Sequence, residues 1–140
     1  MKKIICVLLI FFLFTGCNNN YEKNENIEVI NSVKAIINEK EYPIALENNE
    51  TVKTFVTMLP QKFIMNELNG NEKYIYLDTT LPTNASIPQM INKGDIMLYG
   101  NNCLVIFYQS FSTSYRYTKI GHINDLPDLG NDSILIEFIK

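Results

Sequence analysis

The sequence contains few of the side chains from which catalytic and metal centres are built. It has one histidine, His122, and one arginine, Arg116, among 140 residues. A catalytic triad needs a base held next to a nucleophile, yet no serine or cysteine flanks His122 in "KIGHI". We expect a surface or capping role for this histidine. Zinc takes three or four Cys, His or carboxylate ligands, so we also predict no catalytic residue, no metal site and no cofactor.

Basic residues and phosphate-binding motifs are scarce as well. The chain has 12 Lys and Arg against 15 Asp and Glu, and the basic residues form no cluster. Because nucleic acids and anionic lipid surfaces are bound through clustered Lys and Arg, we expect neither as an electrostatic partner. A glycine-rich phosphate loop and a nucleophile elbow are also missing from the sequence.

Three aspartates stand close together near the C-terminus but do not follow a calcium-loop pattern. Asp125, Asp128 and Asp132 lack the EF-hand order and the bidentate Glu at the twelfth position. We interpret them as solvated turn residues.

The N-terminus has the pattern of a secretory signal. Lys2 and Lys3 precede an apolar run over 4–14 and two small residues, and the run is too short to span a bilayer, which takes about 20 apolar residues. The ending "LFTGC" resembles the lipobox of bacterial lipoproteins, in which the cysteine, here Cys17, receives a diacylglyceryl group and becomes the mature N-terminus. Phe14 stands where that family usually has an aliphatic residue. The alternative is a general secretory signal followed by an incidental cysteine.

The lipobox reading divides the chain into three parts. Residues 1–16 are the signal peptide, 17–31 an Asn-rich tether with too few apolar residues to fold alone, and 32–140 one globular domain. Cleavage removes two lysines and leaves a net charge of −5. Two or more acyl chains hold a protein stably on a membrane, so we expect a cell-envelope protein whose domain lies outside the cytoplasm.

Cysteine use agrees with this division. Cys6 is lost with the signal and Cys17 carries lipid, which leaves Cys103 without a disulfide partner. Cys103 lies in the apolar run "CLVIFY", where a free cysteine behaves as a small buried hydrophobic residue.

Period-two hydrophobic patterns predict about eight strands. They occur around Val33–Ala35–Ile37 and Tyr42–Ile44–Leu46, and in "KFIMNEL", "KYIYLD", "DIMLYG", "CLVIFYQ", "YRYTKIGHI" and "SILIEFIK". Asn69-Gly70 is a strong turn signal between the third and fourth of these strands. Short strands separated by Asn and Gly turns predict a mainly β fold, a small barrel.

One segment has helical periodicity. Val52, Phe55, Val56 and Leu59 follow the i, i+3, i+4, i+7 spacing of an amphipathic helix. Asn48 or Asn49 can cap its start, and Pro60 discourages its continuation. We predict one substantial helix that packs on the sheet.

The passage 79–94, "TTLPTNASIPQMINKG", shows no sustained periodicity. Structureless loops of this length are uncommon in a compact domain, so this one is either ordered by packing or functional.

The segment 68–123 resembles the cyclophilin-like domain of small bacterial proteins. The matching blocks are "GDI", "LYGNN", "LVIFY" and "FSTSYRYTKIGHI", in that order at close spacing, and the helical segment 52–60 also fits. The resemblance extends over about 32–140. It implies a closed eight-stranded cyclophilin-like β-barrel with one flanking helix, which agrees with the strand count.

The resemblance does not bring a catalytic residue with it. True cyclophilins are prolyl isomerases that direct an arginine from an early Phe-His-Arg block at the prolyl amide, and this chain has no such block. Arg116 lies in a late strand, and Lys62 or Lys73 would be a poor substitute for a planar guanidinium.

Three functions remain open at this point. The first is a membrane-anchored binding module for a peptide or small ligand, with an apolar pocket and one cationic group formed near Tyr108, Phe111, Tyr115 and Arg116. The second is a divergent prolyl isomerase. The third is a docking domain for another envelope protein, recognised by a large exposed apolar patch.

Overall fold

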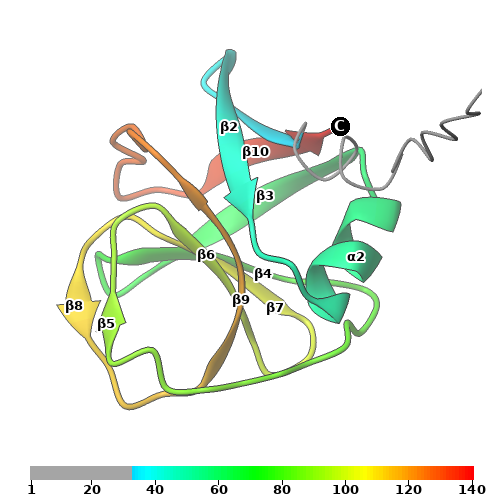
Figure 1. Ribbon diagram of the computed structural model, residues 1–140. Coiled ribbons are helices and arrows are strands. Elements are labelled where there is room, and N and C mark those ends of the chain that lie inside the picture. The colour runs from blue at the N-terminus through cyan, green and yellow to red at the C-terminus, as the bar shows by residue number, and fades with distance from the viewer. Residues whose placement is uncertain (1–32) are drawn as a thin grey trace, which may run out of the picture.

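The computed structural model of the protein describes residues 33–140, and its main element is a closed antiparallel barrel (Figure 1). The barrel strands close in the order β1-β10-β3-β4-β7-β6-β9-β2. Their bounds are β1 (Lys34–Ile37), β2 (Lys40–Leu46), β3 (Gln61–Leu68), β4 (Glu72–Tyr76), β6 (Asp95–Tyr99), β7 (Cys103–Phe107), β9 (Tyr117–Ile123) and β10 (Ile134–Ile139). The predicted mainly β fold with an eight-stranded barrel is confirmed.

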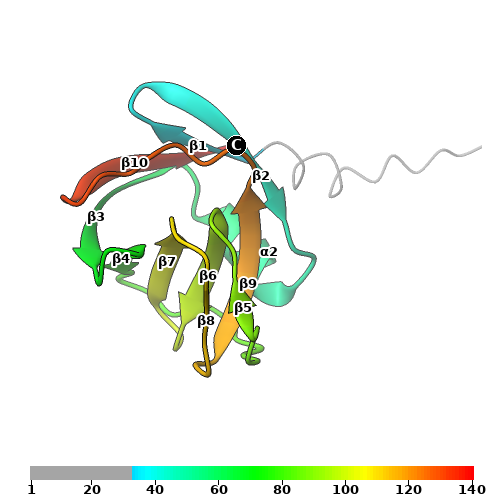
Figure 2. The same ribbon diagram turned by 90° about the vertical axis from the view of Figure 1, so that its left-hand side faces the viewer.

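Two further strands form a small sheet outside the barrel. β5 (Met90–Ile91) pairs with β8 (Phe111–Ser112), and Figure 2 shows this pair in front of the barrel with the helix behind. The sequence did not predict these strands, because two residues contain a single alternation and no period. The passage 79–94 is nevertheless ordered by packing: Leu81 is buried, and Ser86 forms a β-bridge with Tyr117.

The helix α2 (Glu50–Thr57) lies on the opposite side of the barrel from β5 and β8 (Figure 1). The Asn49 side chain accepts a hydrogen bond from the Val52 amide at 2.9 Å, which settles the capping residue. The helix ends at Thr57, shortly before Pro60, as predicted. The predicted stripe, including Val52 and Phe55, is buried.

The turn between β3 and β4 also follows its sequence signal. Asn69 and Gly70 have φ angles of 56° and 67°. Residues 69–71 connect the two strands, and the Asn71 amide donates to the Leu68 carbonyl at 3.2 Å. Positive φ at both central positions of such a turn matches the right-handed twist of a hairpin. Asn-Gly is the sequence that adopts it most readily, because Gly has no Cβ and Asn tolerates this conformation.

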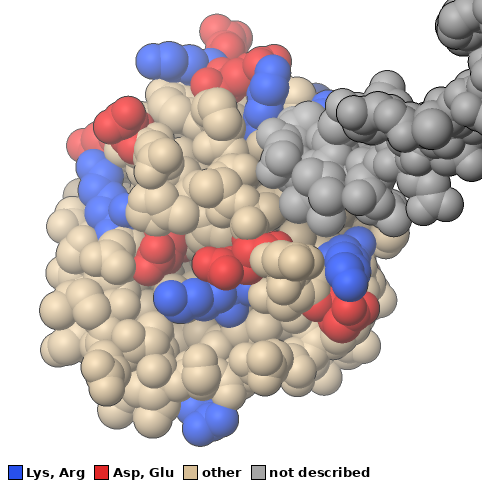
Figure 3. All heavy atoms as spheres, in the orientation of Figure 1, with Lys and Arg blue, Asp and Glu red and all other residues tan. Residues whose placement is uncertain are grey.

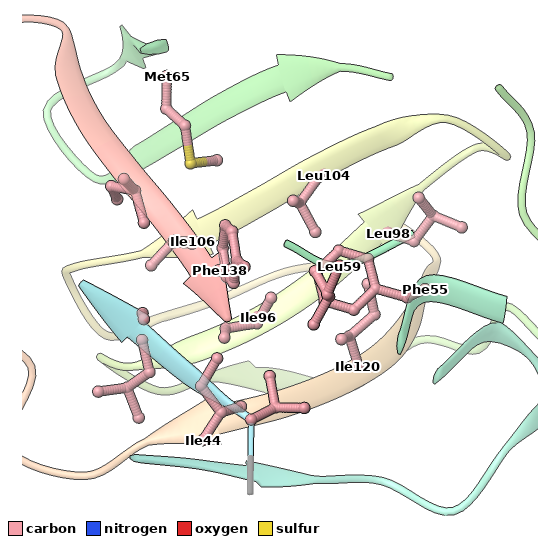
Figure 4. Close-up of a cluster of buried hydrophobic side chains, with 14 of the residues drawn as sticks. Ile44, Phe55, Leu59, Met65, Ile96, Leu98, Leu104, Ile106, Ile120 and Phe138 are labelled. Carbon is pink, nitrogen blue, oxygen red and sulfur yellow. The ribbon is translucent and has the colours of Figure 1, made fainter. Parts of the chain in front are cut away.

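The principal core fills the barrel. Side chains from the inner faces of the strands meet the apolar stripe of α2 (Figure 4). The Phe55 ring of the helix packs edge-on against Phe138 of β10, with 5.5 Å between the ring centroids. The helix is therefore held by the same core that holds the strands.

Strand β7 is buried on both faces. Leu104 and Ile106 point into the barrel core. Cys103, Val105 and Phe107 point outward into a second apolar cluster, where they pack with Ile91, Met97 and Tyr117 under the β5–β8 sheet. Successive side chains of a strand point to opposite faces, and because both faces of β7 are buried, the run Cys103–Phe107 contains no charged residue.

Charges of both signs are interspersed on the face drawn in Figure 3, and large parts of its lower half carry none. Within residues 33–140, no helix has the length and apolar character needed to cross a membrane.

Candidate functional site

A pocket of about 360 Å³ lies on the outer face of the barrel, next to the second apolar cluster. This volume is within the range of small-molecule sites, roughly 300–1,000 Å³. Aromatic side chains dominate its walls. The lining residues are Leu68, Asn69, Asn71, Glu72, Tyr74, Tyr76, Tyr99, Cys103, Val105, Phe111, Tyr115 and Tyr117.

Strand register builds the pocket from four neighbouring strands. Tyr76 of β4 stands opposite Cys103 of β7, Cys103 stands opposite Tyr99 of β6, and Tyr99 stands opposite Tyr117 of β9. One transverse row therefore places a small cysteine between tyrosines. Because cross-strand neighbours lie about 5 Å apart, the short side chain leaves a hollow with aromatic rings on both sides.

The aromatic rings contact one another in a continuous chain along one wall. Tyr115 packs on Tyr99 with a centroid distance of 6.3 Å, and Tyr99 packs on Tyr117 at 5.6 Å. Tyr117 contacts Phe107 at 5.5 Å, and Phe107 contacts Phe111 at 5.6 Å. Edge-to-face and tilted contacts of this kind stabilise aromatic pairs beyond their buried area, so this wall is held in place before any ligand arrives.

The β3–β4 turn forms the rim at the other side. Its positive-φ residues direct the chain back so that Leu68, Asn69 and Asn71 border the pocket. The side-chain oxygen of Asn71 is buried and has no hydrogen-bond partner among the described residues. A buried acceptor without a partner is uncommon in native structures.

Glu72 is the one acidic residue in the pocket lining. Burial raises the pKa of the Glu72 carboxyl above its ordinary value, and the negative charge of Glu67 raises it further. Burial also raises the pKa of Cys103 to about 11 and that of Tyr117 to about 12, with the Glu72 charge as the next cause in both. The thiol and the phenol are therefore neutral at physiological pH, and Cys103 is not an activated nucleophile.

A charged cluster lies on the inner side of β4, behind the pocket. Lys73 is 0% exposed and donates to Glu67 Oε2 at 2.7 Å and to the carbonyl oxygens of Gly130 and Asp132. The Tyr108 hydroxyl donates to the same Glu67 oxygen at 2.8 Å. Lys73 and Glu67 therefore satisfy each other within the fold.

The four residues predicted to bind ligand separate into two groups. Phe111 and Tyr115 line the pocket. Tyr108 is only 5% exposed and belongs to the barrel core. The Arg116 guanidinium donates to the carbonyl oxygen of Ala85, and Arg116 is not among the lining residues. The expected cationic group is thus not part of this pocket, whose charged side chain is acidic.

Sequence reasoning missed most of the pocket. Tyr74 and Tyr76 alternate in "EKYIY", a pattern that places both on one face of a strand. That pattern was a usable signal for an aromatic face. Nothing local connected it with Tyr99 or Tyr117, because strand pairing brings those residues to it.

The remaining polar candidates have structural roles. His122 Nδ1 lies 2.9 Å from Asp95 Oδ1 at the paired ends of β9 and β6. Asp128 accepts a hydrogen bond from the Gly130 amide. Among residues 33–140 no group of three or more His, Cys, Asp or Glu side chains is arranged to hold a metal ion.

The predicted signal peptide (1–16), the tether (17–31) and the lipidated Cys17 lie outside the described residues. They remain predictions from the sequence.

Comparison with known proteins identifies the family. The model of the cyclophilin-like family matches residues 35–138, which is most of the chain and nearly all of the described part. No curated protein and no solved structure matches the sequence. The family match and the closed eight-stranded barrel agree with the resemblance seen in the sequence. The chain belongs to the cyclophilin-like family.

Proposed function

We propose that this protein is a binding module, which holds a small organic ligand or a peptide side chain in the aromatic pocket outside its barrel. The observation that carries the proposal is the concentration of exposed aromatic rings around one concavity. Tyr76 and Tyr115 are 63% and 64% exposed, and Tyr99 is also exposed. Single exposed aromatic residues are ordinary, whereas several that border the same hollow favour a ligand site.

The construction of the pocket supports binding by a preformed site. Its floor belongs to β7, which is buried on both faces, and its aromatic wall is packed against the second apolar cluster. A rigid site loses little conformational entropy when a ligand enters, which favours affinity.

The proposed function does not include a catalytic step. Arg116 donates to Ala85 and lies outside the pocket lining, and the lysine on β4 is committed to Glu67 on the inner face. Neither cation lines the pocket. Binding without turnover is therefore the simpler use of this site.

We further propose that the module works at the cell envelope. The support is the segment "LFTGC" with its preceding basic and apolar residues. A lipid on Cys17 would hold the domain near a membrane through the Asn-rich segment 17–31.

The pocket is tested by nuclear magnetic resonance on the full-length chain in non-ionic detergent, with isotope-labelled tyrosine. A panel of neutral, cationic and anionic small molecules is titrated. We expect saturable shifts of the pocket tyrosines, such as Tyr99 and Tyr115, with at least one member of the panel. Tyr42 and Tyr108 lie outside the pocket lining and serve as internal references.

Variants assign the effect to the pocket. Tyr115→Ala should weaken the binding that the panel reveals by about threefold to tenfold, since an aromatic contact is worth roughly 0.5–1.5 kcal/mol. Ile64→Ala removes an equally exposed apolar side chain outside the pocket and should have no effect. If no panel member produces saturable shifts of the pocket tyrosines, the proposed function is wrong.

The anchor is tested separately by cell fractionation. We expect the wild-type chain in the membrane fraction and Cys17→Ser in a soluble or uncleaved form. A Cys17→Ser protein that is processed and retained on the membrane like wild type would exclude the lipid anchor.

A further inference from the structure

We infer that the ligand of the aromatic pocket carries a positively charged ammonium group, which sits between the Glu72 carboxylate and the tyrosine rings. The inference rests on the proposed function and specifies its ligand class. The juxtaposition that points to it is one carboxylate and several tyrosine rings around the same 360 Å³ pocket.

Strand geometry places the carboxylate on the aromatic face. Glu72, Tyr74 and Tyr76 alternate along β4 and all line the pocket. Residues two apart on a strand are separated by roughly 6.6 Å, so Glu72 lies one such step from Tyr74. Across the sheet Glu72 stands opposite Phe107, against which Phe111 packs. Glu72 therefore lies near the Tyr74 ring on its own strand and near the Phe111 ring that packs on Phe107 of β7.

The Glu72 charge has no counterion within the described part of the chain. No Lys, Arg or His side chain of residues 33–140 forms an ion pair with it, whereas Glu41, Glu50, Glu67 and Glu137 each have one. Lys73, the next residue along the strand, points to the inner face and bonds to Glu67. Glu72 is partly buried, and a desolvated carboxylate is favoured by a cation within about 4–6 Å.

The tyrosine rings favour the same sign of charge. An aromatic ring is negative on its face, and a cation within about 6 Å of the ring centroid is attracted to it. An anionic ligand would meet both the Glu72 charge and the ring faces, and would be repelled. A neutral ligand could bury apolar surface and donate a hydrogen bond, but it would leave the Glu72 charge uncompensated. A cationic group satisfies both the carboxylate and the ring faces, and an ammonium group is its most compact form.

This chemistry can come from two sources, a free alkylammonium compound or the side chain of a lysine in a peptide. In both, apolar carbons adjoin the charged nitrogen and can contact the rings. The experiment therefore uses one matched probe pair for each source, and the members of a pair differ only in charge.

The first pair is choline and its neutral tert-butyl analogue, in which carbon replaces nitrogen. The second is a capped tripeptide with a central lysine and the same peptide with 2-aminoheptanoic acid, in which a methyl group replaces the ammonium group. Each probe is titrated into the full-length chain while the labelled tyrosine resonances are followed. We expect the charged member of at least one pair to bind about tenfold more tightly than its neutral partner, since cation–π contacts and an ion pair add on the order of 1–2 kcal/mol.

Two charge variants locate the origin of the preference. Glu72→Gln keeps the shape of the side chain and should abolish the preference for the charged probe. Glu47→Gln is the matched control, because it removes the same charge from an exposed residue outside the pocket lining. That variant should retain the wild-type preference.

The outcomes separate the two proposals. A charged probe that binds preferentially in wild type and Glu47→Gln but not in Glu72→Gln supports the inference. Equal or tighter binding of the neutral probes, or a preference that survives Glu72→Gln, overturns the inference while leaving the pocket as a binding site. If neither charged probe shifts the pocket tyrosines the inference also fails, and the proposed function fails with it only if the wider panel is silent too.

Discussion

Lys73 is a charged side chain with no exposed surface. Its ammonium group meets one carboxylate and two carbonyl oxygens, and it lies 5.0 Å from the centre of the Tyr108 ring. An ammonium group buried without such partners would cost several kcal/mol. The lysine therefore ties β4 to the loop before β10 through a fully satisfied polar contact.

Replacing this lysine should destabilise the protein strongly. Lys73→Met leaves the Glu67 carboxylate and the carbonyls of Gly130 and Asp132 without their donor, at a cost of about 3 kcal/mol or more. Lys62→Met is the control: Lys62 is largely exposed and pairs with Glu137 at 3.2 Å, a contact worth about 1 kcal/mol at most. Urea unfolding measures both, and equal losses would contradict this role for Lys73.

The effect of Lys73→Met should depend on pH. Burial opposes ionisation of Glu67, but hydrogen bonds from Lys73, Tyr108 and the Gly70 amide outweigh it, so the pKa of Glu67 lies below its ordinary value of 4.5. A lowered pKa in the folded state contributes stability above pH 4.5 and loses it as the pH falls through the folded pKa. The stability difference between wild type and Lys73→Met should therefore shrink below pH 4.5. A difference that stays constant down to pH 3 would argue against the Glu67 pairing.

At the scale of elements, the helix and the turns follow local rules. The stripe of α2, its cap and the Asn69-Gly70 turn were all predictable, because each depends only on residues close together in the sequence. The β5–β8 pair was not predictable, since its two short segments lie on either side of β6 and β7 in the sequence. Only the barrel brings them together.

Asn49 both caps the helix and attaches it to the barrel. Its side-chain oxygen accepts from Val52, and its side-chain nitrogen donates to the Lys119 carbonyl of β9 at 2.8 Å. Asn49→Ala loses both contacts and should lower the free energy of unfolding by about 1–2 kcal/mol. Asn48→Ala changes the exposed neighbouring residue and should stay within about 0.5 kcal/mol of wild type. Chemical denaturation measures the stability of both variants. A larger loss of stability in Asn48→Ala than in Asn49→Ala would show that Asn49 is not the capping residue.

At the scale of the whole molecule, a continuous barrel carries a small external sheet. Every barrel strand pairs with two neighbours, so local unfolding of one strand would break its hydrogen bonds to both of them. The β5–β8 sheet has two residue pairs and one ladder. Elements with few backbone pairs open at lower free energy than the core.

Hydrogen exchange should reveal this difference. Amides of β5 and β8 should exchange by local opening and therefore faster than those of β7. Each 1.4 kcal/mol by which the opening free energy of the small sheet lies below that of β7 makes exchange about tenfold faster. Amides of β7 should exchange only with global unfolding, because this strand is buried on both faces. Equal protection of β7 and β8 would mean that the external sheet belongs to the same cooperative unit as the barrel.

The sequence by itself determined the eight barrel strands, the helix and its stripe, the hairpin turn, and the alternation of faces along "CLVIFY", because each is a property of neighbouring residues. Only the tertiary structure decided which aromatic residues meet. Closure of the barrel sets the register that aligns Tyr76, Cys103, Tyr99 and Tyr117 in one row. The same closure buries Tyr108 inside the barrel and leaves Glu72 on the outer face beside the tyrosines. A one-residue shift in register would exchange the two faces, and local sequence patterns do not specify the register between strands distant in the chain.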